Sequence, residues 1–139
     1  MEPPLRVGQL AEATSVSAKT IRYYELVGVL PAPSRSAAGY RQYDRRDIHR
    51  LLFVRRARSL GLPLGQLRDL TAGLEGEGCA TMRPRLQRLV REQLRAVKQQ
   101  IAELQTLERQ LVNVREGLET AAARPDGKGC HCLDRLSRD

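Results

Sequence analysis

The apolar and polar positions of the first 74 residues follow a helical period that Gly and Pro interrupt repeatedly. Ser17 and Asp44 suit helix N-caps, because their side-chain oxygens can accept hydrogen bonds from early backbone amides. Gly28 and Gly61 suit the ends of the same two helices, since glycine takes a positive φ most easily. Four short helices are therefore predicted, over residues 7–13, 17–27, 44–59 and 63–72.

Residues 30–43 depart from the helical period. They contain two prolines, one glycine and an alternation of Tyr and Arg, which predicts a turn and a short hairpin rather than a helix. In the helix before this segment, Ile21 and Leu26 are expected to face a core, so that the polar side chains lie outside. Two short helices followed by such a hairpin indicate a winged helix-turn-helix.

From Thr81 to Leu118 the pattern is that of one long amphipathic helix with a coiled-coil seam. A helix of this length would extend ~57 Å, too far to bury its seam against the small N-terminal region. Burial of the seam against a partner chain is the simplest interpretation, and packing against the rest of the same chain is the alternative. The seam positions are Val90, Leu94, Val97, Ile101, Leu104, Leu107, Leu111, Val114 and Leu118.

Composition and charge indicate the kind of partner, the compartment and the cysteine chemistry to expect. The net charge of +8 and the pI of about 10.1 favour a polyanionic partner, most commonly nucleic acid, over charge that serves solubility alone. No stretch reaches the ~20 apolar residues of a membrane span, and no signal peptide is evident, so a cytoplasmic protein is expected. The three cysteines would be reduced there, which suits metal or redox chemistry.

The second helix and the hairpin carry residue types that contact DNA. Early positions of a recognition helix reach base edges and phosphates, and a wing can lay Tyr and Arg along the phosphate backbone. Arginines of the third helix add cations, with a solvated basic face as the alternative. The candidate DNA-binding residues are Ser17, Lys19, Thr20, Arg22, Tyr23, Tyr40, Arg41, Arg55 and Arg58.

Three motifs resemble the N-terminal domain of the MerR family of transcriptional regulators. They are IRYYE at 21–25, GYRQY at 39–43 and RRARSLG at 55–61. The resemblance covers nearly the whole chain, including the long helix and the cysteine-containing tail. It implies DNA contacts by Lys19, Arg22, Tyr40 and Arg41, with Arg55 and Arg58 in support and Tyr23 as a neighbour.

The three cysteines flank the predicted long helix. Cys79 precedes it, and Cys130 and Cys132 follow its end by about a dozen residues. The helix ends would lie ~55 Å apart, whereas the chain from Leu118 to Cys130 spans at most ~43 Å. One chain therefore cannot bring its three thiols together. An antiparallel helix pair instead places Cys79 beside Cys130 and Cys132 of the partner subunit, at two sites per dimer.

Three thiolates form a soft donor set, which suits Zn, Cd, Pb, Hg or Cu(I) rather than Mg or Ca. His131 is a further candidate ligand between the two tail cysteines. The family resemblance implies a divalent ion, because relatives that sense Cu(I), Ag(I) or Au(I) carry Ser in place of Cys79. Leu118 stands where many relatives carry Cys, a position that Cys130 could replace.

The predicted protein is mainly α-helical. Its parts are a winged helix-turn-helix DNA-binding domain (1–74), a hinge (75–80), an antiparallel coiled-coil dimerisation helix (81–118) and a metal-binding C-terminal loop and tail (119–139).

The resemblance implies a homodimer that binds a palindromic promoter operator. Metal binding would distort that DNA so that RNA polymerase can use it. Two alternatives stay open: a redox- or electrophile-sensing regulator that uses Cys130 and Cys132, and a ligand-independent architectural DNA-binding protein. An enzyme is not expected, because the sequence contains no base–nucleophile set and no phosphate-cradling loop.

Overall fold

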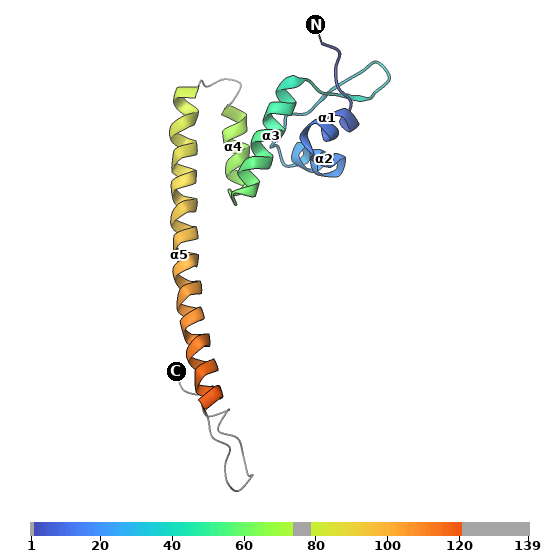
Figure 1. The fold of residues 1–139 in the computed structure, drawn as a ribbon. Helices are drawn as coiled ribbons and strands as arrows, with labels where there is room; N and C mark the ends of the chain where they lie inside the picture. Colours follow the sequence, from blue (N-terminus) through green and yellow to red (C-terminus); the bar gives the residue numbers. More distant parts are fainter. Residues whose placement is uncertain (1, 74–78, 121–139) are drawn as a thin grey trace. The chain divides into compact units, whose positions relative to one another are not determined.

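The computed structural model describes residues 2–73 and 79–120 of the chain. It divides into two compact units, the first ending at Gln93 and the second beginning at Leu94. The predicted helix-turn-helix, wing and long C-terminal helix are confirmed (Figure 1). The elements are α1 (Val7–Thr14), α2 (Ala18–Leu26), β1 (Ser34–Arg35), β2 (Arg41–Gln42), α3 (Arg45–Ser59), α4 (Leu64–Gly73) and α5 (Cys79–Thr120).

The predicted capping residues begin and end the short helices. The Ser17 hydroxyl accepts a hydrogen bond from the amide of Thr20 at 3.1 Å, at the start of α2. Asp44 accepts from the amide of Arg46 at 2.8 Å and begins α3 in the same way. Gly28 and Gly61 follow α2 and α3 with φ of 83° and 81°. These local interactions explain why the element boundaries could be predicted.

The wing is larger than the predicted hairpin. Strands β1 and β2 pair antiparallel, with Ser34 opposite Gln42. The N-terminal segment joins the other edge of the wing, where the amide of Leu5 donates to the carbonyl of Tyr43 at 2.7 Å and the amide of Tyr43 donates to the carbonyl of Leu5 at 2.9 Å. The wing therefore depends on residues that precede α1, which the hairpin pattern did not indicate.

Two aliphatic clusters form the core of the first unit. One is centred on Leu10, Ile21 and Leu51, which lie against Tyr43 of the wing. The expectation that Leu26 faces a core is wrong, because its side chain is 84% exposed. Leu26 lies roughly 140° around the helix axis from buried Ile21. Tyr24 instead turns toward the core on this side of α2.

The second cluster includes the beginning of α5. Leu89 is buried with residues of α3 and α4, and Met82 and Leu86 pack against the same cluster. The Gln93 side chain also donates a hydrogen bond to the carbonyl of Leu60 at 3.1 Å. The helix starts two residues before the predicted 81–118 span and ends two residues after it. Its first turns thus belong to the N-terminal unit rather than to a free dimerisation helix.

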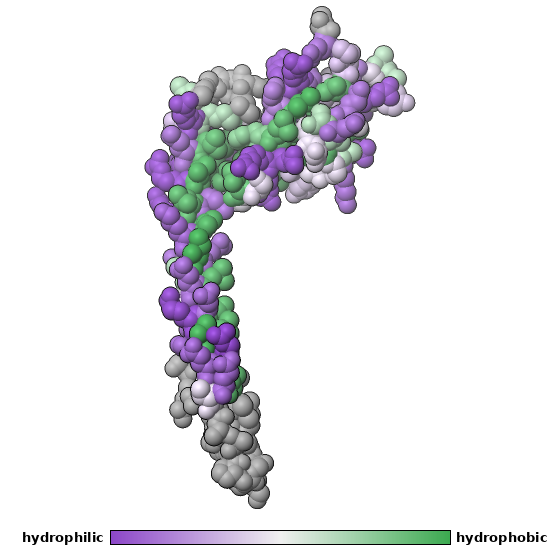
Figure 2. Space-filling view, in the orientation of Figure 1, coloured by the Kyte–Doolittle hydropathy of each residue, from purple (hydrophilic) through white to green (hydrophobic). Residues whose placement is uncertain are grey.

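Beyond Gln93, most seam side chains of α5 are exposed in the single chain. Their exposed fractions range from 36% at Val97 to 65% at Leu104, whereas Val114 is half-buried. Figure 2 shows hydrophobic side chains along this helix among hydrophilic ones. None of the helices in the described ranges is long and apolar enough to cross a membrane. This apolar seam is therefore a surface that another polypeptide could bury.

Candidate nucleic-acid interface

Helix α2 presents one exposed stripe of side chains. Lys19, Arg22, Tyr23 and Leu26 are all exposed and follow the i, i+3, i+4, i+7 spacing of a single helix face. Ser17 and Thr20 lie at the start of the helix, and their hydroxyls are joined by a 2.9 Å hydrogen bond. Two cations, an aromatic ring and an apolar side chain can thus reach one partner, an arrangement that suits a helix in the major groove of DNA.

The tyrosines of α2 divide between surface and core. The Tyr23 side chain is 51% exposed, whereas Tyr24 packs against both core clusters. Their ring centroids lie 6.2 Å apart with a tilt of 45°. Tyr23 is therefore accessible and lies beside a partly buried aromatic neighbour.

In the wing, Tyr40 is exposed and interacts with Arg6, a residue outside the predicted DNA-binding set. The Arg6 guanidinium carbon lies 4.9 Å from the centroid of the Tyr40 ring, a cation–π geometry. The pairing of Leu5 with Tyr43 brings the N-terminal segment alongside the wing. The only sequence signal for Arg6 was its place directly before α1. Its relation to the wing is evident only from the pairing of Leu5 with Tyr43.

Arg41 was expected to contact a DNA phosphate, but part of its side chain contacts another residue of the protein. Its Nε lies 3.3 Å from Oε2 of Glu25, and its side chain is half-buried. The Tyr43 hydroxyl donates to Oε1 of the same carboxylate. Burial, and then this hydrogen bond to Glu25, raises the pKa of Tyr43 well above its usual range, so the hydroxyl stays a donor. The recognition helix and the wing are therefore joined through one carboxylate.

Arg55 and Arg58 are exposed, but both have internal hydrogen-bond partners. Arg55 Nη1 donates to the carbonyl of Thr14 at 3.4 Å, at the C-terminal end of α1. Arg58 Nη1 donates to the carbonyl of Leu62 at 3.0 Å, in the turn before α4. Arg55 thus satisfies a carbonyl at the end of α1, whereas Arg58 bonds to a carbonyl of the turn between α3 and α4. Their contact with DNA stays a prediction. Their hydrogen bonds to backbone carbonyls were not predicted from the sequence.

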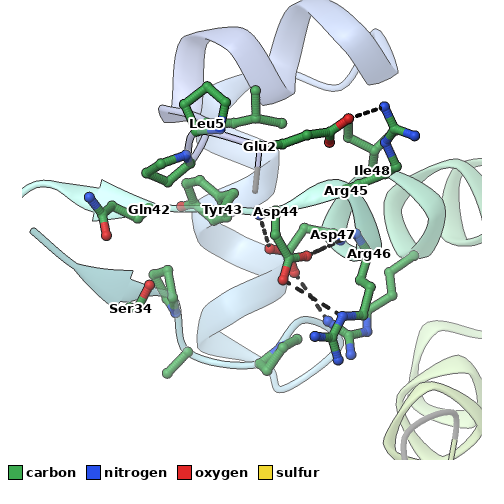
Figure 3. A pocket seen from close by; sticks show the side chains of 16 residues that line it. Glu2, Leu5, Ser34, Gln42, Tyr43, Asp44, Arg45, Arg46, Asp47 and Ile48 are labelled. Carbon is green, nitrogen blue, oxygen red and sulfur yellow. Dashed lines mark hydrogen bonds and ion pairs between the residues drawn. The ribbon is translucent and has the colours of Figure 1, made fainter.

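A cavity of about 920 Å³ lies between the N-terminal segment, the wing and the start of α3 (Figure 3). None of the predicted DNA-binding residues lines it. Its charged groups form ion pairs with one another, as in Arg45 with Glu2 at 2.6 Å and Arg50 with Asp47 at 3.1 Å. This mutual neutralisation makes the cavity a poor anion site and separates it from the candidate interface.

The predicted metal site lies mostly outside the described residues. Cys79 is the first residue of α5, whereas His131 and the two tail cysteines, Cys130 and Cys132, lie beyond Thr120. Within residues 2–73 and 79–120, no group of three or more His, Cys, Asp or Glu side chains is placed to hold a metal ion. His49 is exposed on α3.

Comparison with known proteins identifies the family. The profile described as MerR HTH family regulatory protein matches residues 5–74, and the one described as MerR, DNA binding matches residues 48–114. The mercuric resistance operon regulatory protein of Bacillus cereus is 32% identical over 111 residues, which cover 80% of this chain and 83% of that protein.

Two further similarities cover nearly the full length. The HTH-type transcriptional regulator HmrR of Rhizobium leguminosarum bv. viciae is 34% identical over 133 residues, which cover 96% of this chain and 98% of that protein. The crystal structure of the transcription regulator PbrR691 from Ralstonia metallidurans CH34, in complex with lead(II), superposes with a TM-score of 0.71 at 32% identity, over 96% of this chain and 99% of that one. These proteins are regulators rather than enzymes. The chain belongs to the MerR family of DNA-binding helix-turn-helix transcriptional regulators.

Proposed function

We propose that this protein is a cytoplasmic, metal-responsive activator that binds a palindromic promoter operator as a homodimer. The exposed stripe of α2 beside the wing carries the DNA-binding half of the proposal, because it gathers Lys19, Arg22 and Tyr23 on one accessible face. A relative's name refers to mercuric resistance, and a similar structure contains lead(II). Both support a soft divalent metal as the signal.

The uncovered seam of α5 supports a dimer. From Leu94 to Leu118, large aliphatic side chains recur at coiled-coil spacing and are exposed in the single chain. Burying this seam against a second copy removes apolar surface from water, a favourable contribution of roughly 25 cal/mol per Å² before the entropy lost on association is subtracted.

The distribution of charge along α5 favours an antiparallel pair. The first half of the helix carries six basic residues and one acidic residue, whereas the half after Gln99 carries four acidic residues and two basic ones. A parallel pair would set like charge against like charge. An antiparallel pair sets the basic start of one helix beside the acidic end of the other.

The same arrangement brings the cysteines together. With 42 residues, α5 is ~63 Å long, and the ten residues from Thr120 to Cys130 span at most ~36 Å. A three-thiolate site that includes Cys79 therefore requires Cys130 and Cys132 of the partner subunit. Three thiolates match Zn, Cd, Pb or Hg.

Regulation follows if the metal binds one conformation of the dimer more tightly than the other. The first turns of α5 pack into the core of the DNA-binding unit through Leu86 and Leu89. A change at Cys79 can therefore shift the recognition helices. Distorting DNA costs on the order of a few kcal/mol, and the difference in metal affinity supplies it. RNA polymerase then reads the distorted promoter.

A metal titration tests this proposal. The reduced protein is titrated separately with Zn, Cd, Pb, Hg and Cu(I) while thiolate-to-metal ultraviolet absorption is recorded. We expect saturation at about two ions per dimer, with weaker binding by Cys79→Ser and unchanged binding by the exposed control Ser59→Ala. If no ion binds the reduced protein tightly, metal sensing is wrong, and oxidants acting on Cys130 and Cys132 become the next candidates.

A further inference from the structure

We infer that Glu25 is a positioning residue for DNA binding, which fixes the wing relative to the recognition helix and holds Arg41 in place. The inference rests on the proposed DNA contact of the wing. Glu25 belongs to α2, whereas both of its partners, Arg41 and Tyr43, lie at or next to β2. One carboxylate thus joins the two elements that are expected to meet DNA.

The geometry uses both carboxylate oxygens. Oε1 accepts the hydrogen bond from the Tyr43 hydroxyl, and Oε2 lies 3.3 Å from Nε of Arg41. The Glu25 side chain is only 9% exposed, which leaves little room for water to replace either partner. Arg41 Nε is itself buried, and its contact with Glu25 is an ion pair rather than an aligned hydrogen bond. A buried pair of this kind loses more when one member is removed than an exposed pair does.

Tyr43 anchors this arrangement to the fold. Its ring is 3% exposed within the core cluster of Leu10, Ile21 and Leu51. Its backbone pairs with Leu5 in both directions. Because Tyr43 is fixed by these contacts, Glu25 is held too, and Arg41 is then set against a rigid group. The Arg41 side chain is still 36% exposed, so part of it remains accessible to a phosphate.

The sign of the charge makes the role of Glu25 testable. A carboxylate on the same helix as Lys19 and Arg22, and paired with Arg41, opposes the approach of a polyanion. If Glu25 acted only through its charge, its removal would tighten DNA binding. If it positions Arg41 and the wing, its removal weakens DNA binding even though the protein becomes more basic.

The experiment measures the affinity of full-length protein for a duplex recovered by selection from a random library, across a range of salt concentrations. We expect Glu25→Gln to weaken binding by about tenfold. The matched control is Glu12→Gln, which removes the same charge from an exposed position of α1 and should leave affinity within about twofold, or slightly tighter. Tyr43→Phe, which keeps the charge and the buried ring, should weaken binding in the same direction as Glu25→Gln.

Salt dependence separates a positioning role from a direct contact. Arg41→Gln should reduce the slope of log affinity against log salt by about one phosphate equivalent. In that background, Glu25→Gln should cost less affinity than it does in wild type, because one of the two side chains that it holds is gone. Amide exchange should quicken in the wing of Glu25→Gln while α3 keeps its protection, which distinguishes a loosened wing from an unfolded domain.

The outcomes distinguish a failure of the proposed wing contact from a failure of the positioning role of Glu25. If Arg41→Gln changes neither affinity nor slope, the proposed wing contact is wrong, and this inference fails with it. If Arg41→Gln weakens binding but Glu25→Gln matches the Glu12→Gln control, the wing contact stands and the positioning role of Glu25 is wrong. Additive losses in the double variant would also overturn the inference.

Discussion

The two units bury their apolar side chains by different means. The first unit packs Leu10, Ile21, Leu51 and Leu67 so completely that their side chains have no exposed surface. The second unit leaves Leu104 and other seam residues of α5 uncovered. The first can therefore be understood as a single folded chain, whereas the second makes physical sense only in an assembly. The candidate DNA-binding surface belongs to the self-contained unit, whereas the proposed sensor combines Cys79 of that unit with Cys130 and Cys132 of the part that needs a partner.

The largest expected effect comes from placing charge in the seam. Leu104→Glu combined with Leu111→Glu should convert the dimer to a monomer, because four carboxylates would be buried without partners. Loss of the second binding module should then reduce DNA affinity by at least about 100-fold. Sedimentation equilibrium and DNA titration check both effects. Gln105→Glu, on an exposed position away from the seam, is the control, and a dimer that survives the double substitution would contradict the proposed interface.

An intermediate effect is expected in the self-contained core. Leu51→Ala should lower the free energy of unfolding by about 3 kcal/mol, because it leaves a cavity among fully buried neighbours. The same loss should appear in the monomeric Leu104→Glu/Leu111→Glu background, as measured by urea unfolding. If the loss disappears in the monomer, the first unit does not fold independently of the seam, and the contrast between the two units is wrong.

The smallest expected effect concerns the wing. Arg6→Gln removes the cation–π contact with Tyr40, an interaction of about 0.5–1 kcal/mol. DNA affinity should therefore fall by roughly two- to fivefold. Arg95→Gln removes the same charge from an exposed position of α5. Equal losses from the two variants in a competition assay would mean that net charge, rather than the order of the wing, explains the effect of Arg6.

Local chemistry made much of the fold predictable. Ser17 and Asp44 begin helices through hydrogen bonds that span two or three residues, so their sequence neighbours alone indicate the boundary. The hairpin was likewise evident from its Pro, Gly and Tyr pattern. The face of α2 was harder to assign, because a short helix offers several apolar positions. Only tertiary packing selects Ile21 as core and leaves Leu26 outside.

The candidate site was predictable as a set of residue types but not as a set of contacts. Arg55 bonds to a carbonyl 41 positions away in the chain, and Glu25 bonds to a tyrosine 18 positions away. Such partners depend on how the helices pack, which no short motif encodes. Cys79 could be placed at the start of a helix, whereas Cys130 and Cys132 lie outside the described residues and stay predicted ligands.

The central claim is that the metal site forms between two antiparallel chains. Mixing two variants, each defective in metal binding, tests it most directly. One variant is Cys79→Ser, and the other carries Cys130→Ser and Cys132→Ser. Mixed dimers are isolated with two different affinity tags and titrated with the metal that wild type binds most tightly. A cross-chain site predicts that each mixed dimer regains about one tightly bound ion of the wild-type pair, although both parents bind the metal more weakly than wild type. Failure of the mixed dimer to bind metal, while it remains dimeric, would contradict the account.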